Sequence, residues 1–211
     1  MLFEEVKLHT SRLAEIKHFY KDTLGLKVAD DSDSSFALQI GYTNMIFVHS
    51  EMENEPFYHF AWMIPKNRFQ EAKAWAAARV ELRTQDGEDE TFSENWNSHS
   101  LYFEDPAGNI LELIAHHNTH HESDRPFSAE DLLQVCEVGL VSEDVLSTVG
   151  ELEQMGLNQW GAISETFAPV GDVNGLFIVV KEERIWFFSE QKAQRFPLEV
   201  VVQGVGSLQF G

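Results

Sequence analysis

The residues best suited to chemistry in this chain are ionisable side chains that interrupt apolar segments. Glu5, His59 and Glu112 each have apolar neighbours within segments that resemble β-strands. A charged carboxylate inside a sheet core costs several kcal/mol unless it is paired or bound to a metal. Two carboxylates and one imidazole would form a hard oxygen and nitrogen set, suited to Mn²⁺, Fe²⁺, Zn²⁺ or Mg²⁺. Without a metal, Glu5 and Glu112 could pair with Lys7 or hydrogen-bond to His59.

Three other groups of residues have a simpler interpretation. His116, His117, His120 and His121 lack any thiolate partner and lie in a polar stretch, which favours a solvated loop over a Zn²⁺ or Ni²⁺ site. Cys136 has apolar flanks and is the chain's one cysteine, so we expect a buried thiol and no internal disulfide. Asp30, Asp31 and Asp33 lack the glycine and the final Glu of a calcium loop, which favours a solvated turn.

The elements that would position these residues follow a repeated order within residues 1–117. A strand-like segment, a helical period and further strand-like segments occur twice. The first helix is indicated by apolar residues at helical spacing over residues 13–24, and the last strand over residues 110–115. Before that last strand comes a turn of sequence Asp-Pro-Ala-Gly-Asn, residues 105–109. This order predicts two βαβββ units in residues 1–117.

A third copy of the unit begins after a polar segment without hydrophobic period. Glu137-Val138-Gly139-Leu140 repeats Glu5-Val6-Lys7-Leu8, and a helical period follows it. Residues 175–190 have the same length as the hairpin predicted over residues 36–51, and both end in Ser-Glu. We therefore predict a second hairpin there and one further strand after it. Glu137 takes the place of Glu5 in this copy, which we expect to have lost its site.

The predicted fold class is α+β, with paired βαβββ modules and a third, degenerate module. Residues 1–117 form the two-module domain, residues 118–131 a linker, and residues 132–211 the third module with its extra strand. The third module alone would leave an unpaired sheet edge, and proteins cover such edges. We expect it either to pack against the first domain or to complete a half-barrel with a second copy in a homodimer.

Two segments carry a resemblance to a known superfamily. They are residues 19–26, Phe-Tyr-Lys-Asp-Thr-Leu-Gly-Leu, and the more specific residues 101–113, Leu-Tyr-Phe-Glu-Asp-Pro-Ala-Gly-Asn-Ile-Leu-Glu-Leu. The chain resembles the vicinal oxygen chelate superfamily, which includes glyoxalase I, bleomycin-resistance proteins, fosfomycin-resistance enzymes and extradiol ring-cleaving dioxygenases. The resemblance is clear over residues 1–117 and weaker over residues 132–202. It implies that two modules pair their sheets into a cupped half-barrel with a divalent metal in the cup.

The resemblance also implies a set of metal ligands. The first strands of the two modules place Glu5 and His59 at ligand positions, and the strand after the turn places Glu112 there. Superposing the last strands of the two modules places Phe47 at a fourth position, which glyoxalase I fills with a carboxylate. The dioxygenases and fosfomycin enzymes carry two His and one Glu, so Glu5 in place of His is a departure from their pattern.

Two residues are candidates for moving protons at such a site. Tyr102 lies ten residues before Glu112, and the resemblance implies a pocket-lining hydrogen-bond donor or acid at this spacing; a packing tyrosine is the alternative. His9 shares a strand face with Glu5 by the period of two, and either reaches the cup or lies in solvent near the strand end. Trp96 and His99 are candidates for walls of the pocket.

The charge of the chain argues against several classes of partner. Its 211 residues contain 15 Lys and Arg against 35 Asp and Glu, a formal net charge of −20. Nucleic acids and anionic membranes attract clustered cations, so we expect neither as a partner. No apolar run approaches the roughly 20 residues of a membrane span, and no secretory signal precedes the first strand. The sequence therefore predicts a cytoplasmic protein that binds a small molecule.

The function predicted from the resemblance is that of a metal-dependent enzyme acting on a small oxygen-rich or aromatic molecule. A metal ion (Fe, Mn, Zn or Mg) would chelate neighbouring substrate oxygens, and Tyr102, with His9, would move protons. Dioxygenase-like chemistry is favoured over thiol transfer or isomerisation. The alternative is a metal-free protein that sequesters an aromatic or antibiotic-like compound, as the bleomycin-resistance members do.

Overall fold

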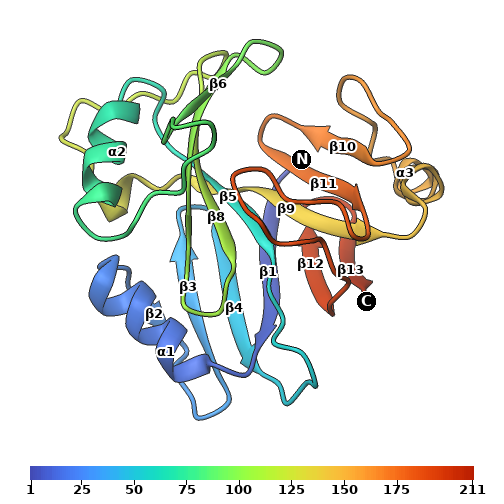
Figure 1. Cartoon of the computed structure of the whole chain (residues 1–211), viewed down its shortest axis with the longest axis horizontal. Coiled ribbons are helices and arrows are strands. Elements are labelled where there is room, and N and C mark those ends of the chain that lie inside the picture. Colours follow the sequence, from blue (N-terminus) through green and yellow to red (C-terminus); the bar gives the residue numbers. More distant parts are fainter.

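The computed structural model describes all of residues 1–211 as two curled sheets with helices packed against them (Figure 1). The helical elements are α1 (Leu13–His18), the π-helical turn η1 (Phe19–Thr23), α2 (Phe69–Ala77), the 3₁₀ turn η2 (Ala129–Asp131) and α3 (Val145–Gln154). The strands are β1 (Phe3–Thr10), β2 (Val28–Ala29), β3 (Ser35–Ile40), β4 (Thr43–His49), β5 (His59–Met63), β6 (Thr91–Ser93), β7 (Ser98–Glu104), β8 (Ile110–His116), β9 (Gln134–Ser142), β10 (Phe167–Asp172), β11 (Gly175–Lys181), β12 (Leu198–Val202) and β13 (Gly206–Phe210).

The strand order shows how the repeated units combine. One sheet has six strands in the order β13-β12-β1-β4-β3-β2, and the other has seven in the order β10-β11-β9-β5-β8-β7-β6. Within each unit the first and last strands are parallel, as in the pairs β1–β4, β5–β8 and β9–β11. Between units the first strands pair antiparallel, β5 with β9 and β1 with β12. The fold is therefore α+β with paired βαβββ-type modules.

The pairing of modules differs from the predicted division of the chain. Residues 118–131 join β8 to β9, and both of these strands belong to the seven-stranded sheet. The second module therefore pairs with the third, whereas the first module pairs with β12 and β13 (Figure 1). Residues 1–117 and 132–211 thus share both sheets. Because β9 pairs with β5 of the same chain, no second copy is needed to complete the half-barrel.

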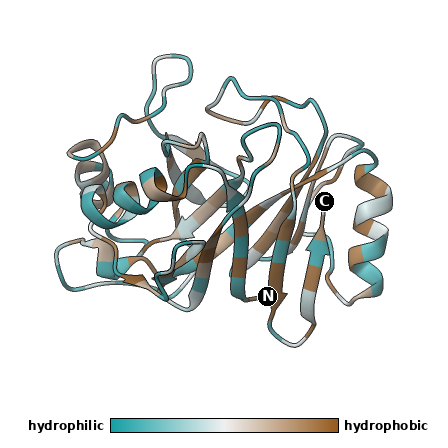
Figure 2. Ribbon diagram, turned by 90° about the horizontal axis from the view of Figure 1, so that it is seen from below, coloured by the Kyte–Doolittle hydropathy of each residue, from teal (hydrophilic) through white to brown (hydrophobic).

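The main core lies where the inward faces of both sheets and the helices meet. It is a cluster of 44 buried residues, which includes Phe3 and Phe47 from one sheet and Phe60 and Trp62 from the other. Burying each such side chain contributes about 1.5–3 kcal/mol. Hydrophobic residues follow the central strands, whereas the outer loops are mostly hydrophilic (Figure 2). None of the helices has both the length and the apolar character that a bilayer span requires.

The third module has its hairpin earlier in the chain than predicted. The hairpin is β10 with β11, so Gly175 begins the last strand of this module and the prediction of a hairpin over residues 175–190 is wrong. Residues 182–197, which we name the covering segment, leave β11 and fold back through a single bridge between Ile185 and Lys192. Trp186 and Phe188 of this segment pack with Tyr102 and Ile178 in a second buried cluster.

Candidate functional site

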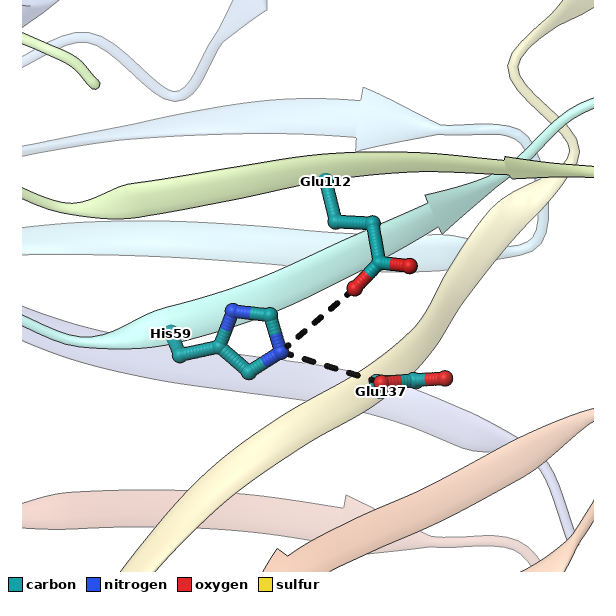
Figure 3. A group of neighbouring side chains, drawn as sticks. All are labelled: His59, Glu112 and Glu137. Carbon is teal, nitrogen blue, oxygen red and sulfur yellow. Dashed lines mark ion pairs between the residues drawn. The ribbon is translucent and has the colours of Figure 1, made fainter. Parts of the chain in front are cut away.

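Three buried ionisable side chains converge on one face of the seven-stranded sheet. Nε2 of His59 lies 3.7 Å from a carboxylate oxygen of Glu112 and 3.7 Å from one of Glu137 (Figure 3). One donor atom from each of the three residues lies within 4.8 Å of the others. All three side chains are buried. This arrangement has the ligand types and the spacing of a metal centre.

The strand register explains why these three residues meet. Ala61 of β5 is the register partner of Glu112 on β8 and also of Glu137 on β9. The two carboxylates therefore flank Ala61, whose methyl group leaves the space between them open. His59 precedes Ala61 by two residues and so points to the same face of the sheet. The opposite face of β5 carries Phe60 and Trp62, which belong to the main core.

The turn at residues 105–109 holds β8 in this register. The buried carboxylate of Asp105 accepts hydrogen bonds from the backbone N–H groups of Ala107 and Asn109 and from the side-chain amide of Asn109. It also accepts the Tyr20 hydroxyl, at 2.8 Å, which ties the turn to η1. The Asn109 side-chain oxygen accepts the N–H of Tyr58, the residue before His59. Both segments of the superfamily resemblance therefore serve to position the site.

Burial sets the protonation of the group. It lowers the pKa of His59, against the opposing charge of Glu112. Nδ1–H of His59 donates to the carbonyl oxygen of Ile110 at 3.2 Å, which leaves the lone pair of the neutral ring on Nε2, facing the carboxylates. Burial raises the pKa of both Glu112 and Glu137 to about 8, and for Glu112 the neighbouring Glu137 adds to the effect.

The group fits a divalent cation on two grounds. No Lys or Arg pairs with Glu112 or Glu137, whose ion-pair partner is in each case His59. In addition, one carboxylate oxygen of Glu137 is fully buried and has no hydrogen-bond partner. A buried carboxylate without a donor is costly. A divalent ion among these three residues would give the Glu137 carboxylate a cationic partner and offset the charges of both carboxylates.

The triad opens onto a cavity of about 390 Å³. Its walls are largely aromatic and come from β6, the turn between β6 and β7, β7, β10 and the covering segment: Phe92, Trp96, Tyr102, Phe167, Trp186 and Phe187. Ser98, Ser100 and Arg184 add polar groups. Phe92 and Phe187 are both about half exposed. Pockets of this volume and character suit a small molecule.

Trp186 forms the wall next to the triad. Its ring centroid lies 5.2 Å from that of His59, and the strand below has Gly139 at this point. A Cβ at residue 139 would lie 2.7 Å from a ring carbon of Trp186 and 3.2 Å from Cβ of His59. Glycine is therefore the residue that lets the indole pack over β9 against the histidine.

Glu5 and His9, two of the predicted site residues, lie on the other sheet. Both belong to β1, and neither lines the cavity. Glu5 is partly buried and accepts a hydrogen bond from the Asn44 side chain at 3.4 Å. The lowered pKa of His9 comes mainly from burial. His59 and Glu112 are thus brought together as predicted ligands, but Glu137 stands with them instead of Glu5.

The fourth ligand position, predicted at Phe47, also lies elsewhere. Phe47 points into the core, where its ring stacks on Tyr20 and Phe36. In the seven-stranded sheet, the residue that corresponds to Glu112 is Ile178, because Leu176 pairs with Glu137 as Ile110 pairs with His59. Ile178 lines the cavity. The fourth position is apolar in this site as well.

The remaining candidates divide between the cavity and its surroundings. Tyr102 and Trp96 line the cavity, whereas His99 does not and instead contacts His117, at 2.7 Å between ring nitrogens. His116 is the last residue of β8 and is buried beside Trp96, so its assignment to a solvated loop is wrong. Burial lowers its pKa to about 4. Cys136 is buried, as predicted.

Glu137 is the site residue that sequence reasoning missed. A signal for it exists in the sequence. Polar and apolar side chains alternate over residues 5–8, which is the pattern of a half-exposed strand. Glu137, in contrast, interrupts a run of small and apolar residues: Val135, Cys136, Val138 and Gly139. All seven residues from Gln134 to Leu140 are buried. A carboxylate in such a strand is the stronger candidate for a ligand.

Comparison with known proteins gives structural matches only. No protein-family model matches the sequence, and a search of curated proteins returned no match. A provisionally assigned dioxygenase from Bacillus subtilis subsp. subtilis str. 168 superposes with a TM-score of 0.59 and 18% identity, over 85% of this chain and 63% of that chain. Glyoxalase I from Zea mays superposes with a TM-score of 0.55 and 14% identity, over 92% and 72% of the two chains.

Identities this low show a shared fold alone. The chain spans less than two thirds of the length of the Bacillus protein. The chain therefore shares its fold with glyoxalase I and with the Bacillus protein.

Proposed function

We propose that the chain is a metal-dependent enzyme that acts on a small oxygen-rich or aromatic molecule. The observation that carries the proposal is the buried group of His59, Glu112 and Glu137 at the base of an aromatic cavity. The two carboxylates have no Lys or Arg beside them, and burial raises the pKa of both. A resident divalent ion accounts for this arrangement better than a packing role, because buried carboxylates stabilise a fold poorly.

His59, Glu112 and Glu137 would hold the ion, and Fe, Mn, Zn and Mg all suit this donor set. When bound, the ion supplies a Lewis acid that binds neighbouring substrate oxygens. Three protein ligands would leave coordination positions of the ion free for those oxygens. Nδ1–H of His59, held by the Ile110 carbonyl, fixes the orientation of the ring.

Tyr102 is the group proposed to handle a proton. Its position is directly opposite Glu112 in the register of β7 and β8, and it lines the cavity. Burial, with the charges of Glu112 and Glu137, raises its pKa well above the ordinary value. The hydroxyl therefore stays protonated and acts as a donor to substrate oxygen. We favour dioxygenase-like chemistry over thiol transfer or isomerisation because the aromatic walls suit a ring.

Metal content tests the proposal directly. Protein purified without chelator should contain about one divalent ion per chain, measured by mass spectrometry of the metal. Glu112→Gln and Glu137→Gln should each lower the occupancy about tenfold or more. Glu5→Gln is the matched control, because Glu5 lies on the other sheet, and it should keep the wild-type occupancy. Equal metal content in Glu137→Gln and wild type would reject the site.

The second candidate function is metal-free sequestration of an aromatic compound. The aromatic walls of the cavity favour it. A thermal-shift experiment separates the two candidates, since a ligand that binds only the folded state raises the melting temperature. Stabilisation by Mn²⁺ or Fe²⁺ that is lost in Glu137→Gln favours the enzyme. If divalent ions have no effect and an aromatic ligand stabilises, sequestration is the better assignment.

A further inference from the structure

Arg184 differs from the other arginines of the chain. It is the one arginine whose guanidinium has neither a carboxylate within 4.0 Å nor a hydrogen bond. Arg12, Arg68, Arg83, Arg125 and Arg195 all form ion pairs, and Arg79 donates to the Trp75 carbonyl. With 35 acidic residues against 15 basic ones, an arginine without a carboxylate partner calls for an explanation.

The position of Arg184 supplies that explanation. It lines the cavity that contains His59, Glu112 and Glu137, and no other Lys or Arg does so. Its side chain is partly buried, and its guanidinium carbon lies 5.2 Å from the ring centroid of Phe167, a second wall residue. Burial lowers its pKa, but an arginine stays charged at neutral pH.

The backbone of Arg184 is held in place before any ligand arrives. Glu183 N–H donates to the carbonyl of Ala193, and Ala193 N–H donates to the carbonyl of Arg184, both at 2.8 Å. Further along, the Gln191 side chain donates to the Gly108 carbonyl at 2.7 Å, which anchors the covering segment to the turn before β8. Both the segment and the turn are thus fixed relative to the triad. A preordered cation loses less entropy on binding an anion.

We propose that Arg184 is a specificity-determining residue and that the substrate class is a single-ring aromatic carboxylate. The ring would lie between the aromatic walls, and the carboxylate would accept hydrogen bonds from the guanidinium fork. The cavity of about 390 Å³ is near the lower end of ligand pockets, roughly 300–1,000 Å³. That volume favours one ring over a polycyclic compound. The assignment rests on the proposed function, since it names the ligand of the same cavity.

Two probes, one with a carboxylate and one with a neutral hydroxymethyl group in its place, test the assignment. They are 2-hydroxybenzoate and 2-hydroxybenzyl alcohol, which share the ring and the phenol. Trp96 and Trp186 line the cavity, so quenching of tryptophan fluorescence reports occupancy without any enzymatic assay. Wild type should bind the carboxylate about tenfold or more tightly than the alcohol, since charge-assisted pairs are the stronger ones. Equal affinities, or no binding of either probe at millimolar concentration, would overturn the assignment.

Variants then assign the discrimination to Arg184. Arg184→Gln should weaken 2-hydroxybenzoate about tenfold or more and leave the alcohol within about twofold, whereas Arg184→Lys should retain part of the preference. Arg195→Gln is the matched control, because Arg195 belongs to the same covering segment but pairs with Glu143 and Glu182 outside the cavity. Unchanged binding of 2-hydroxybenzoate by Arg184→Gln contradicts the assignment.

Repeating the titrations with and without chelator separates this inference from the metal proposal. If the preference for the carboxylate persists in chelator and depends on Arg184, the inference holds even where divalent ions prove not to bind. If metal binds through Glu112 and Glu137 but Arg184→Gln discriminates as wild type does, only the inference fails. Failure of the metal proposal and failure of this inference therefore give different results, because Arg184 is not among the proposed metal ligands.

Discussion

At the scale of single residues, the site depends on two carboxylates that share one buried space. Because Ala61 pairs with both Glu112 and Glu137, the sheet itself places the two carboxyl groups on either side of one methyl group. Each of the three side chains alone has an unfavourable position for a charge. Together they form an arrangement that holds protons in the absence of a cation and exchanges them for a cation when one is present.

This exchange makes metal binding pH-dependent. In the folded, metal-free protein the pKa of Glu112 and Glu137 is about 8, above the ordinary 4.5. The folded state therefore holds more protons than the unfolded state between these values, and stability without metal should fall as pH rises from about 5 to 8. A metal displaces the protons, so its affinity should rise over the same range.

Calorimetric titration in two buffers of different ionisation enthalpy measures the exchange. At pH 7 each Mn²⁺ bound should release about one proton or more, and Glu5→Gln should release as many as wild type. An enthalpy that is the same in both buffers, in a titration that does show binding, would mean that the carboxylates are already ionised.

At the scale of elements, the turn at residues 105–109 determines the register of β8. Asp105→Ala leaves the Tyr20 hydroxyl, the Asn109 amide and two backbone N–H groups without their acceptor. Loss of this buried network should cost about 3 kcal/mol or more, which lowers the melting temperature by about 6–12 °C at this chain length. Asp124→Ala, at an exposed position, should change it little. Calorimetry or circular dichroism checks both.

Strand β9 makes a second prediction through Gly139. A methyl group there overlaps the Trp186 ring, so Gly139→Ala should push the indole away from His59. We expect a loss of about 1–3 kcal/mol, with a changed tryptophan emission maximum. Gly150→Ala on α3 is the control, since a Cβ at residue 150 meets nothing within 4 Å, and it should stabilise by about 1 kcal/mol. An unchanged emission spectrum in Gly139→Ala would show that Trp186 does not rest on this strand.

The elements also show what sequence could and could not predict. The order of strand, helix and strands, and the turn before Glu112, follow from local periodicity and turn chemistry. The partner of each module does not, because β1, β5 and β9 are all apolar first strands and pairing depends on tertiary packing. The error over Glu5 follows from this: the repeated order of elements predicts that β1 pairs with β5, whereas β5 pairs with β9.

At the scale of the whole molecule, the two sheets carry corresponding positions with different contents. Val6 pairs with Val200 as Phe60 pairs with Val138, so Glu5 corresponds to His59 and Glu199 to Glu137. Lys7 stands where Ala61 stands in the other sheet, and its ammonium group pairs with Glu199 at 3.1 Å. In the six-stranded sheet, the ammonium group of Lys7 thus takes the place that a metal ion would have. The site can form on only one of the two sheets.

The sharing of both sheets by the two halves of the chain predicts a single unfolding transition. Residues 1–117 supply β1 and β5, whose neighbours β12 and β9 come from residues 132–211, and one cluster of 44 buried residues includes both parts. Neither half can unfold without exposing the apolar edge of the other. Scanning calorimetry should therefore give one peak, with a van't Hoff enthalpy equal to the calorimetric enthalpy. That enthalpy should be about 150 kcal/mol at 60 °C. Two separate peaks would mean that the predicted division at residues 118–131 is a thermodynamic boundary, in spite of the shared sheets.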